Sequence, residues 1–275
     1  MTKTTQLRTG VVTPNKNISF PIGTVLTVQR YYDHLNLSEI FGKHKSRGHN
    51  INSLIEALVS YKLTENQSVT KAADWINRKE VLNTFELESF EQRTLYRVLE
   101  IIGENREEII ARLQDVLFEI YDFEHTNINM DWTSIVLHGN KCKIGKYGYS
   151  RDHRPDKKQI TIGLSELRSP INVPVGLTVQ PGNMNDITHF TYTFEQVKPF
   201  LKEGSLVVFD KGASSKENLT RVQWSKMKYI SSKKWNRSDD KVAALFSKET
   251  WELLDPEVGL WGMKRVYPIR VDYFY

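Results

Sequence analysis

Two aspartates lie on apolar, β-branched segments of this 275-residue sequence. Asp131 falls inside the alternating run NINMDWTSIV, and Asp210 follows the run SLVVF 79 residues later. Aspartate is disfavoured inside strands, so the position of Asp131 calls for an explanation. Magnesium prefers hard oxygen ligands, and paired divalent ions catalyse hydrolysis and transfer at phosphodiesters. If the two segments are neighbouring strands, both carboxylates meet at one sheet edge and could support metal-dependent chemistry on phosphates.

The spacing alone leaves simpler explanations open. Asp131 could face solvent without a function, and Asp210 could be a turn residue before Lys211-Gly212. Trp132, which follows Asp131, could pack in a core or stack on a nucleic-acid base.

A long basic connection lies between the two aspartates, with the string GYSRDHRPDKKQITIGL from Gly148 to Leu164. Long loops are more often functional or disordered than short ones. Its cations Arg151, Arg154, Lys157 and Lys158 could clamp a phosphate backbone, arginine through bidentate hydrogen bonds and lysine as a point charge. The alternative is a flexible, solvated hairpin tip.

The net charge of +5 is unevenly distributed along the chain. Residues 1–126 carry 15 Lys and Arg against 17 Asp and Glu, whereas the remaining residues carry 23 against 16. Between Lys141 and Lys158, seven basic residues stand against two acidic ones. Such a local field attracts polyanions, although a basic surface can also serve solubility alone.

Several other classes of protein find no support in the sequence. No apolar run approaches the roughly 18–20 residues of a membrane span, and the N-terminus has no apolar signal segment. Cys142 is the sole cysteine, which excludes an internal disulfide and fits a cytosolic setting. The histidines show no zinc-ligand spacing, and no Walker, dinucleotide or GxSxG motif occurs.

The hydrophobic periodicity changes near Asn127. Before it, helical spacing predicts helices that include Ser89–Ile102 and Glu107–Phe123, the latter opened by a capping box of Asn105 and Glu108. After it, we predict strands at 128–137, 160–164, 173–179, 206–209 and from 229, with helices at 188–201 and 214–224. A box of Ser214 and Glu217 opens the last helix. This order predicts an α/β fold with a mixed sheet and flanking helices, preceded by an all-helical region.

Three strings together resemble the "insertion sequence four" (IS4-like) family of DDE transposases: MDWTS, GYSRDHRPDKKQITIGL and VVFDKGASSKENL. A fair likeness continues in GLTVQPGNMND, and the resemblance covers roughly Asn127 to Trp235. It implies a ribonuclease-H-like fold, with Asp131 and Asp210 as catalytic residues and metal ligands for two Mg²⁺ (or Mn²⁺) ions. Such enzymes cut DNA at element ends with activated water, and the freed 3′-hydroxyl then attacks target DNA.

The sequence departs from the family at the third carboxylate. The family places a glutamate on a late helix in a Tyr-x-x-Arg-x-x-x-Glu frame, and no such frame follows Asp210 here. Glu249, Glu252 and Glu257 are the only glutamates after Glu217, and none fits it. The aromatic run RVYPIRVDYFY alternates like a strand and then stops. We therefore expect a transposase truncated within a β-rich insertion, with strand transfer impaired.

The sequence thus predicts residues 1–126 as a helical region that could bind DNA ends, 127–245 as a partial ribonuclease-H-like core, and 246–275 as the start of the insertion. The predicted function is DNA transposition by metal-dependent cleavage and strand transfer. The alternatives are a catalytically dead DNA-binding remnant and a related metal-dependent nuclease. The expected partner is DNA, at element ends and target, with Arg151, Arg154, Lys157 and Lys158 as contacts. A homodimer is compatible with this interpretation, no membrane is involved, and the expected location is cytoplasmic, associated with the nucleoid.

Overall fold

A computed structural model of the chain describes residues 22–44, 47–121, 127–168, 172–232, 237, 252–257 and 260–262. The chain divides into one compact unit that ends at Ile230 and another that begins at Ser231. Within the described ranges, no helix combines the length and apolar character needed to cross a bilayer. The predicted strand in RVYPIRVDYFY lies outside the described residues.

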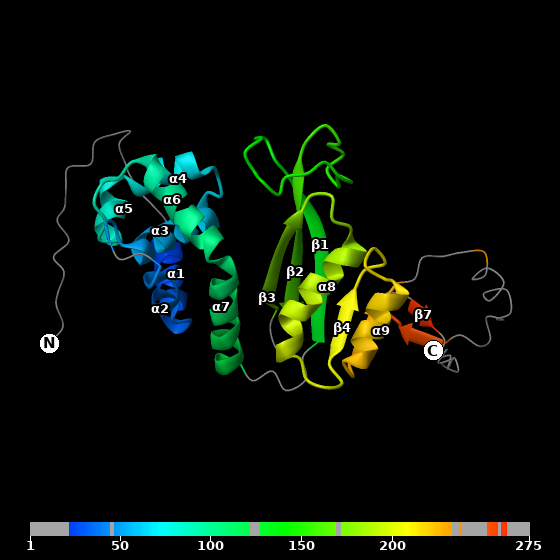
Figure 1. Cartoon of the computed structure of the whole chain (residues 1–275). Coiled ribbons are helices and arrows are strands. Elements are labelled where there is room, and N and C mark those ends of the chain that lie inside the picture. Colours follow the sequence, from blue (N-terminus) through cyan, green and yellow to red (C-terminus); the bar gives the residue numbers. More distant parts are fainter. Residues whose placement is uncertain are drawn as a thin grey trace. The chain divides into compact units, whose positions relative to one another are not determined.

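Helices make up the described part of the chain before residue 121 (Figure 1). They are α1 (Ile22–His34), α2 (Leu37–Gly42), α3 (Ile51–Thr64), α4 (Val69–Ile76), α5 (Lys79–Thr84), α6 (Gln92–Glu104) and α7 (Arg106–Ile120). Their apolar faces enclose one hydrophobic core in which Leu54, Ile76 and Leu95 are fully buried. This confirms the predicted helical region.

The predicted capping box at the start of α7 is wrong. The Asn105 side chain donates a hydrogen bond to the Ile101 carbonyl at 2.8 Å and makes no cap bond to α7. A single residue joins α6 to α7, so Asn105 ends one helix as it begins the next. Its backbone, at φ −104° and ψ 13°, is not in the extended conformation that a capping side chain needs.

Five strands form a mixed sheet in the order β3-β2-β1-β4-β5. The strands are β1 (Asn127–Val136), β2 (Gln159–Leu167), β3 (Val173–Pro181), β4 (Leu206–Phe209) and β5 (Lys228–Ser231). β1 pairs antiparallel with β2, and β2 pairs antiparallel with β3, whereas β1 and β4 run parallel. The predicted mixed sheet with flanking helices is confirmed.

The helices α8 (Asp186–Val197) and α9 (Lys216–Trp224) pack together against the sheet, and a 3₁₀ turn (Lys198–Phe200) follows α8 (Figure 1). The alternate residues of β1 that face this core are buried, and the Trp132 ring contacts Phe190 at a centroid distance of 5.9 Å. Core packing of Trp132, one of the two predicted alternatives, is therefore what the structure shows. Because strand side chains alternate between faces, Asp131 lies on the face opposite to Trp132.

The cap of α9 differs by one residue from the prediction. Ser215, and not Ser214, accepts the capping hydrogen bond, from the Asn218 backbone N–H at 3.2 Å. The Asn218 amide is buried and donates to the carbonyls of Ile187 and Ala213. These bonds tie the first turn of α9 to the start of α8.

Helix α7 contacts the edge strand β3. The buried Gln114 side chain donates to the Val175 carbonyl at 2.5 Å, and the Phe118 ring stacks on Phe200 at 4.6 Å. A free strand edge invites unwanted pairing, and this contact uses one of its carbonyls within the chain.

The second unit contains an antiparallel pair, β6 (Glu252–Asp255) and β7 (Leu260–Gly262). Both strands fall in the stretch where a β-rich insertion was predicted, most of whose other residues lie outside the described ones. The three domain boundaries stay a prediction.

Candidate active site

Asp131 projects from the middle of β1 on the face that α8 does not cover. Its neighbours Met130 and Trp132 are buried in the core, whereas Asp131 is exposed. The Asp131 Oδ1 accepts a hydrogen bond from the Trp132 backbone N–H at 2.8 Å. The core on one face therefore fixes the strand that presents this carboxylate on the other.

Asp210 directly follows β4, the parallel neighbour of β1. Met130 pairs with Phe209 in the ladder, so the next position on each strand is Asp131 on one and Asp210 on the other. Asp210 Oδ1 accepts a hydrogen bond from the Gly212 backbone N–H at 3.0 Å, which orients it in the turn before α9. The structure thus brings the two predicted aspartates together where β4 ends, and we call this place the carboxylate edge.

A third carboxylate, Asp186, joins this edge and was missed by the sequence reasoning. It occupies the first turn of α8, behind the N-cap Asn185. Burial raises the pKa of Asp186, and the charges of Asp210 and Asp131 raise it further, against the lowering effect of Arg151. The sequence pointed to Asp186 only through the family likeness of the string GLTVQPGNMND, which ends at this residue.

Gly212 leaves room for two of these carboxylates. A Cβ at this position would lie 2.7 Å from Asp186 Oδ2 and 3.1 Å from Asp210 Oδ1. Any other side chain would therefore push at least one carboxylate away from the edge.

The basic segment does not present its four predicted cations as one free cluster. Arg151 forms an ion pair with Asp186 at 2.6 Å, whereas Arg154 binds Asp156 through two hydrogen bonds of 2.9 and 2.8 Å. The bonds from Arg154 lower the pKa of Asp156 to about 2. Lys157 and Lys158 follow, half-buried, just before β2. Of these four cations, Arg151 is the one that forms an ion pair with a carboxylate of this edge, that of Asp186.

The sequence of residues 123–260, half of the chain, matches the family model described as "Transposase DDE domain". The chain belongs to the transposase DDE domain family. No protein with curated annotation matches this DDE chain. Among solved structures it is similar to a piggyBac transposase synaptic complex with hairpin DNA, at 16% identity and a TM-score of 0.40. That match covers 85% of this chain and 55% of the piggyBac chain, so the chain spans about half of that transposase. A Mos1 strand transfer complex is similar at 11% identity and a TM-score of 0.28, covering 74% of this chain and 69% of that one.

A buried polar network supports the strand that carries Asp131 in this DDE domain. The Trp132 indole N–H donates to Thr193 Oγ1 at 3.0 Å, and Thr178 Oγ1 lies 3.0 Å from Thr193 Oγ1 and 2.8 Å from His189 Nε2. A Cβ at Gly163 would lie 2.4 Å from Thr193 Oγ1. The network therefore joins β1, β2, β3 and α8 immediately behind the carboxylate edge.

The His189 ring in this network makes stability depend on pH. Burial lowers its pKa from the ordinary 6.5 to about 4, so the unfolded DDE domain binds a proton that the folded one excludes. Stability conferred by the neutral ring is complete above pH 6.5 and is lost as the pH falls toward 4. We expect a loss of about 2 kcal/mol between pH 7 and pH 5, measured by urea unfolding.

The variant His189→Gln is the control for this pH effect. Glutamine does not titrate but can still hydrogen-bond to Thr178, so its unfolding free energy should change less between the two pH values. An equal pH dependence in both proteins would assign the effect to other groups.

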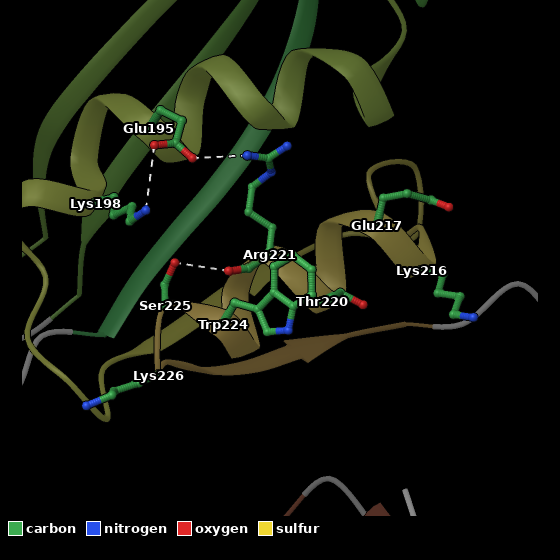
Figure 2. A pocket seen from close by; sticks show the side chains of 9 residues that line it. All are labelled: Glu195, Lys198, Lys216, Glu217, Thr220, Arg221, Trp224, Ser225 and Lys226. Atoms are coloured by element: carbon green, nitrogen blue, oxygen red, sulfur yellow. Dashed lines mark hydrogen bonds and ion pairs between the residues drawn. The ribbon is translucent and has the colours of Figure 1, made fainter. Parts of the chain in front are cut away.

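The DDE domain has a hollow of about 680 Å³ along α8 and α9 (Figure 2). The Trp224 side chain is 85% exposed at its rim. Glu195 forms ion pairs there with Arg221 at 3.2 Å and with Lys198 at 3.8 Å. Its wall holds two acidic side chains, Glu195 and Glu217, and four basic ones, Lys198, Lys216, Arg221 and Lys226.

Proposed function

We propose that this chain performs the chemistry of an insertion-sequence transposase of the IS4-like type: metal-dependent cleavage of DNA at element ends and strand transfer. The proposal rests on one observation above all. In a chain of the transposase DDE domain family, Asp131 of β1 and Asp210, which directly follows the parallel neighbour β4, each come one residue after the last paired position of the two strands. Paired carboxylates at a sheet edge suit divalent ions that act on phosphodiesters.

The donor set fits magnesium or manganese. DDE transposase domains generally use divalent metal ions. Asp131 and Asp210 offer hard carboxylate oxygens, and water and substrate phosphate can fill the remaining positions around such an ion. When bound there, a divalent ion would supply Lewis-acid stabilisation of charge on the phosphate. In the described ranges, no group of three or more His, Cys, Asp or Glu is arranged to hold a metal by itself.

The roles of the surrounding residues follow from their contacts. The Gly212 N–H holds the Asp210 carboxylate in place, and the buried Trp132 fixes the backbone on which Asp131 stands. Arg151, at the same edge, is positioned to bind a DNA phosphate, with Arg154, Lys157 and Lys158 contributing along the loop. DNA is thus the proposed partner.

The proposal is tested by incubating the chain with supercoiled plasmid in Mg²⁺ or Mn²⁺. We expect metal-dependent nicks that EDTA abolishes, with joined products on sequencing where strand transfer follows cleavage. Nicks without any joined product would favour a related metal-dependent nuclease over a transposase. Nicks that persist in EDTA would contradict the metal-dependent mechanism.

A further inference from the structure

A cavity of about 370 Å³ adjoins the carboxylate edge. It lies between the segment that carries Arg151 and the turn that joins β3 to α8. Its wall includes Ser134, Tyr149, Arg151, Asn183, Asp186 and Gly212. Gly212 is two residues from Asp210, so a molecule in this cavity would lie beside the proposed cleavage site.

Tyr149 contributes a solvent-exposed aromatic ring to the wall of this cavity. Its side chain is 86% exposed, although an aromatic ring of this size normally gains from burial. The backbone beneath the ring is held firmly. The Gln159 side chain, at 1% exposure, donates to the Tyr149 carbonyl at 2.8 Å and to the Gly182 carbonyl at 2.9 Å.

The residue before Tyr149 fixes the ring further. A Cβ at Gly148 would lie 2.1 Å from the Gly182 carbonyl oxygen, so the two chain segments touch through their backbones. An exposed ring on an anchored backbone loses little conformational entropy when it stacks on a flat ligand.

The polar groups of the wall suit a nucleotide. Asn183 is exposed, and its amide, which makes no side-chain hydrogen bond among the described residues, can both donate and accept at a base edge. Arg151 stands across the cavity in its ion pair with Asp186, and the segment from Lys141 to Lys158, with seven basic residues against two acidic ones, favours a polyanion.

We infer that this cavity is a nucleobase site, which takes an unpaired base of the DNA strand and stacks it on Tyr149. The inference rests on the proposed function, because it places that base beside the phosphate that the carboxylate edge would cleave. Stacking on an aromatic side chain tolerates any base, so the site should recognise an unpaired state more than a sequence.

The hollow along α8 and α9 is the weaker candidate for such a site. Trp224 is as exposed as Tyr149, and Arg221 and Lys198 there are paired with Glu195 (Figure 2), as Arg151 is with Asp186. Among the described residues, none of Asp131, Asp186 and Asp210 lines this hollow, so a base bound there would not lie beside the carboxylate edge. Trp224 therefore provides a matched control for an exposed aromatic residue.

The test compares two DNA probes, a blunt duplex and the same duplex extended by a single-stranded overhang. We expect the full chain to bind the overhang probe about tenfold more tightly, the size of effect typical of one stacked base. Tyr149→Ala should lose this preference, whereas Tyr149→Phe, which keeps the ring, and Trp224→Ala should retain it.

A second measurement needs no variant. A 2-aminopurine base in the overhang should lose fluorescence on binding when it stacks. No preference for the overhang, no quenching, or equal losses in Tyr149→Ala and Trp224→Ala would each overturn the nucleobase site. The proposed function is judged separately, because metal-dependent nicking of plasmid could persist without any overhang preference, and only its absence would count against the proposed chemistry.

Discussion

Magnesium should raise the melting temperature of the native chain, and Asp131→Asn or Asp210→Asn should each remove most of this rise. Ions that bind the folded state at a hundredfold excess over Kd stabilise it by about 2.7 kcal/mol. For a chain of this size, that corresponds to a shift of roughly 5–10 °C. Because the two carboxylates occupy adjacent register positions, neither should hold the ion well without the other. Thermal unfolding with and without Mg²⁺ measures the effect directly.

The same variants have a second expected signature in the absence of metal. The pKa of Asp186 is raised by its burial and by the charges of Asp210 and Asp131, which indicates like-charge repulsion at this edge. Removing one charge should therefore leave the metal-free melting temperature unchanged or higher. A variant that loses the Mg²⁺ shift while keeping its own stability has lost a metal site and not its fold.

Nicking of plasmid by these variants should fall by about a thousandfold or more, since the ion supplies several kcal/mol of stabilisation at the phosphate. Glu203→Gln is the matched control, because this side chain is 69% exposed and pairs with Lys226 away from the edge. The assignment of Asp131 and Asp210 as ligands would be contradicted if Mg²⁺ did not change the melting temperature of the native chain. It would also be contradicted if the variants kept the full Mg²⁺-induced rise in melting temperature.

The sequence was informative where local pattern determines structure. The short apolar run Leu206–Phe209 was predicted as a strand and forms β4 with the same bounds, between β1 and β5. Alternation in the run around Asp131 predicted a strand, which forms as β1. The sequence also predicted that Asp131 and Asp210 would meet if their two segments were neighbouring strands, and β1 does pair with β4. Period and residue type suffice for such elements.

What the sequence could not supply were contacts between segments that are distant along the chain. Asp186 reaches the carboxylate edge because α8 begins beside the turn after β4, and no local pattern encodes that proximity. The helix caps failed for a related reason. Two adjacent serines, or one asparagine shared by two helices, offer equivalent local signals, and packing decides which side chain caps.

The most consequential of these distant contacts joins the string GYSRDHRPDKKQITIGL, through Gln159, to the string GLTVQPGNMND, through Gly182. The variant Gly182→Ala should break this contact. A Cβ at Gly182 would lie 2.0 Å from the Gln159 carbonyl oxygen and 2.6 Å from that of Lys146. Both are backbone atoms, and the Lys146 and Gln159 backbones are bonded to each other in both directions, at 3.1 and 2.9 Å. Neither can retreat without losing those bonds.

We expect Gly182→Ala to lower the free energy of unfolding by about 3 kcal/mol, at the upper end of overpacking effects. Urea unfolding measures this against Gly139→Ala, in the β1–β2 connection. A Cβ at Gly139 meets nothing within 4 Å, so that variant should be neutral or slightly stabilising.

The consequence for DNA distinguishes a local defect from a loss of the site. In Gly182→Ala the Gln159 side chain should lose its bond to the Gly182 carbonyl, and the backbone under Tyr149 would then be free to move. Preference for an overhang should fall together with stability, while the Mg²⁺ shift through Asp131 and Asp210 should survive at temperatures where the variant is folded. If Gly182→Ala were as stable as Gly139→Ala, the two strings would not be held against each other. The claim that the backbone of Tyr149 is fixed would then be wrong.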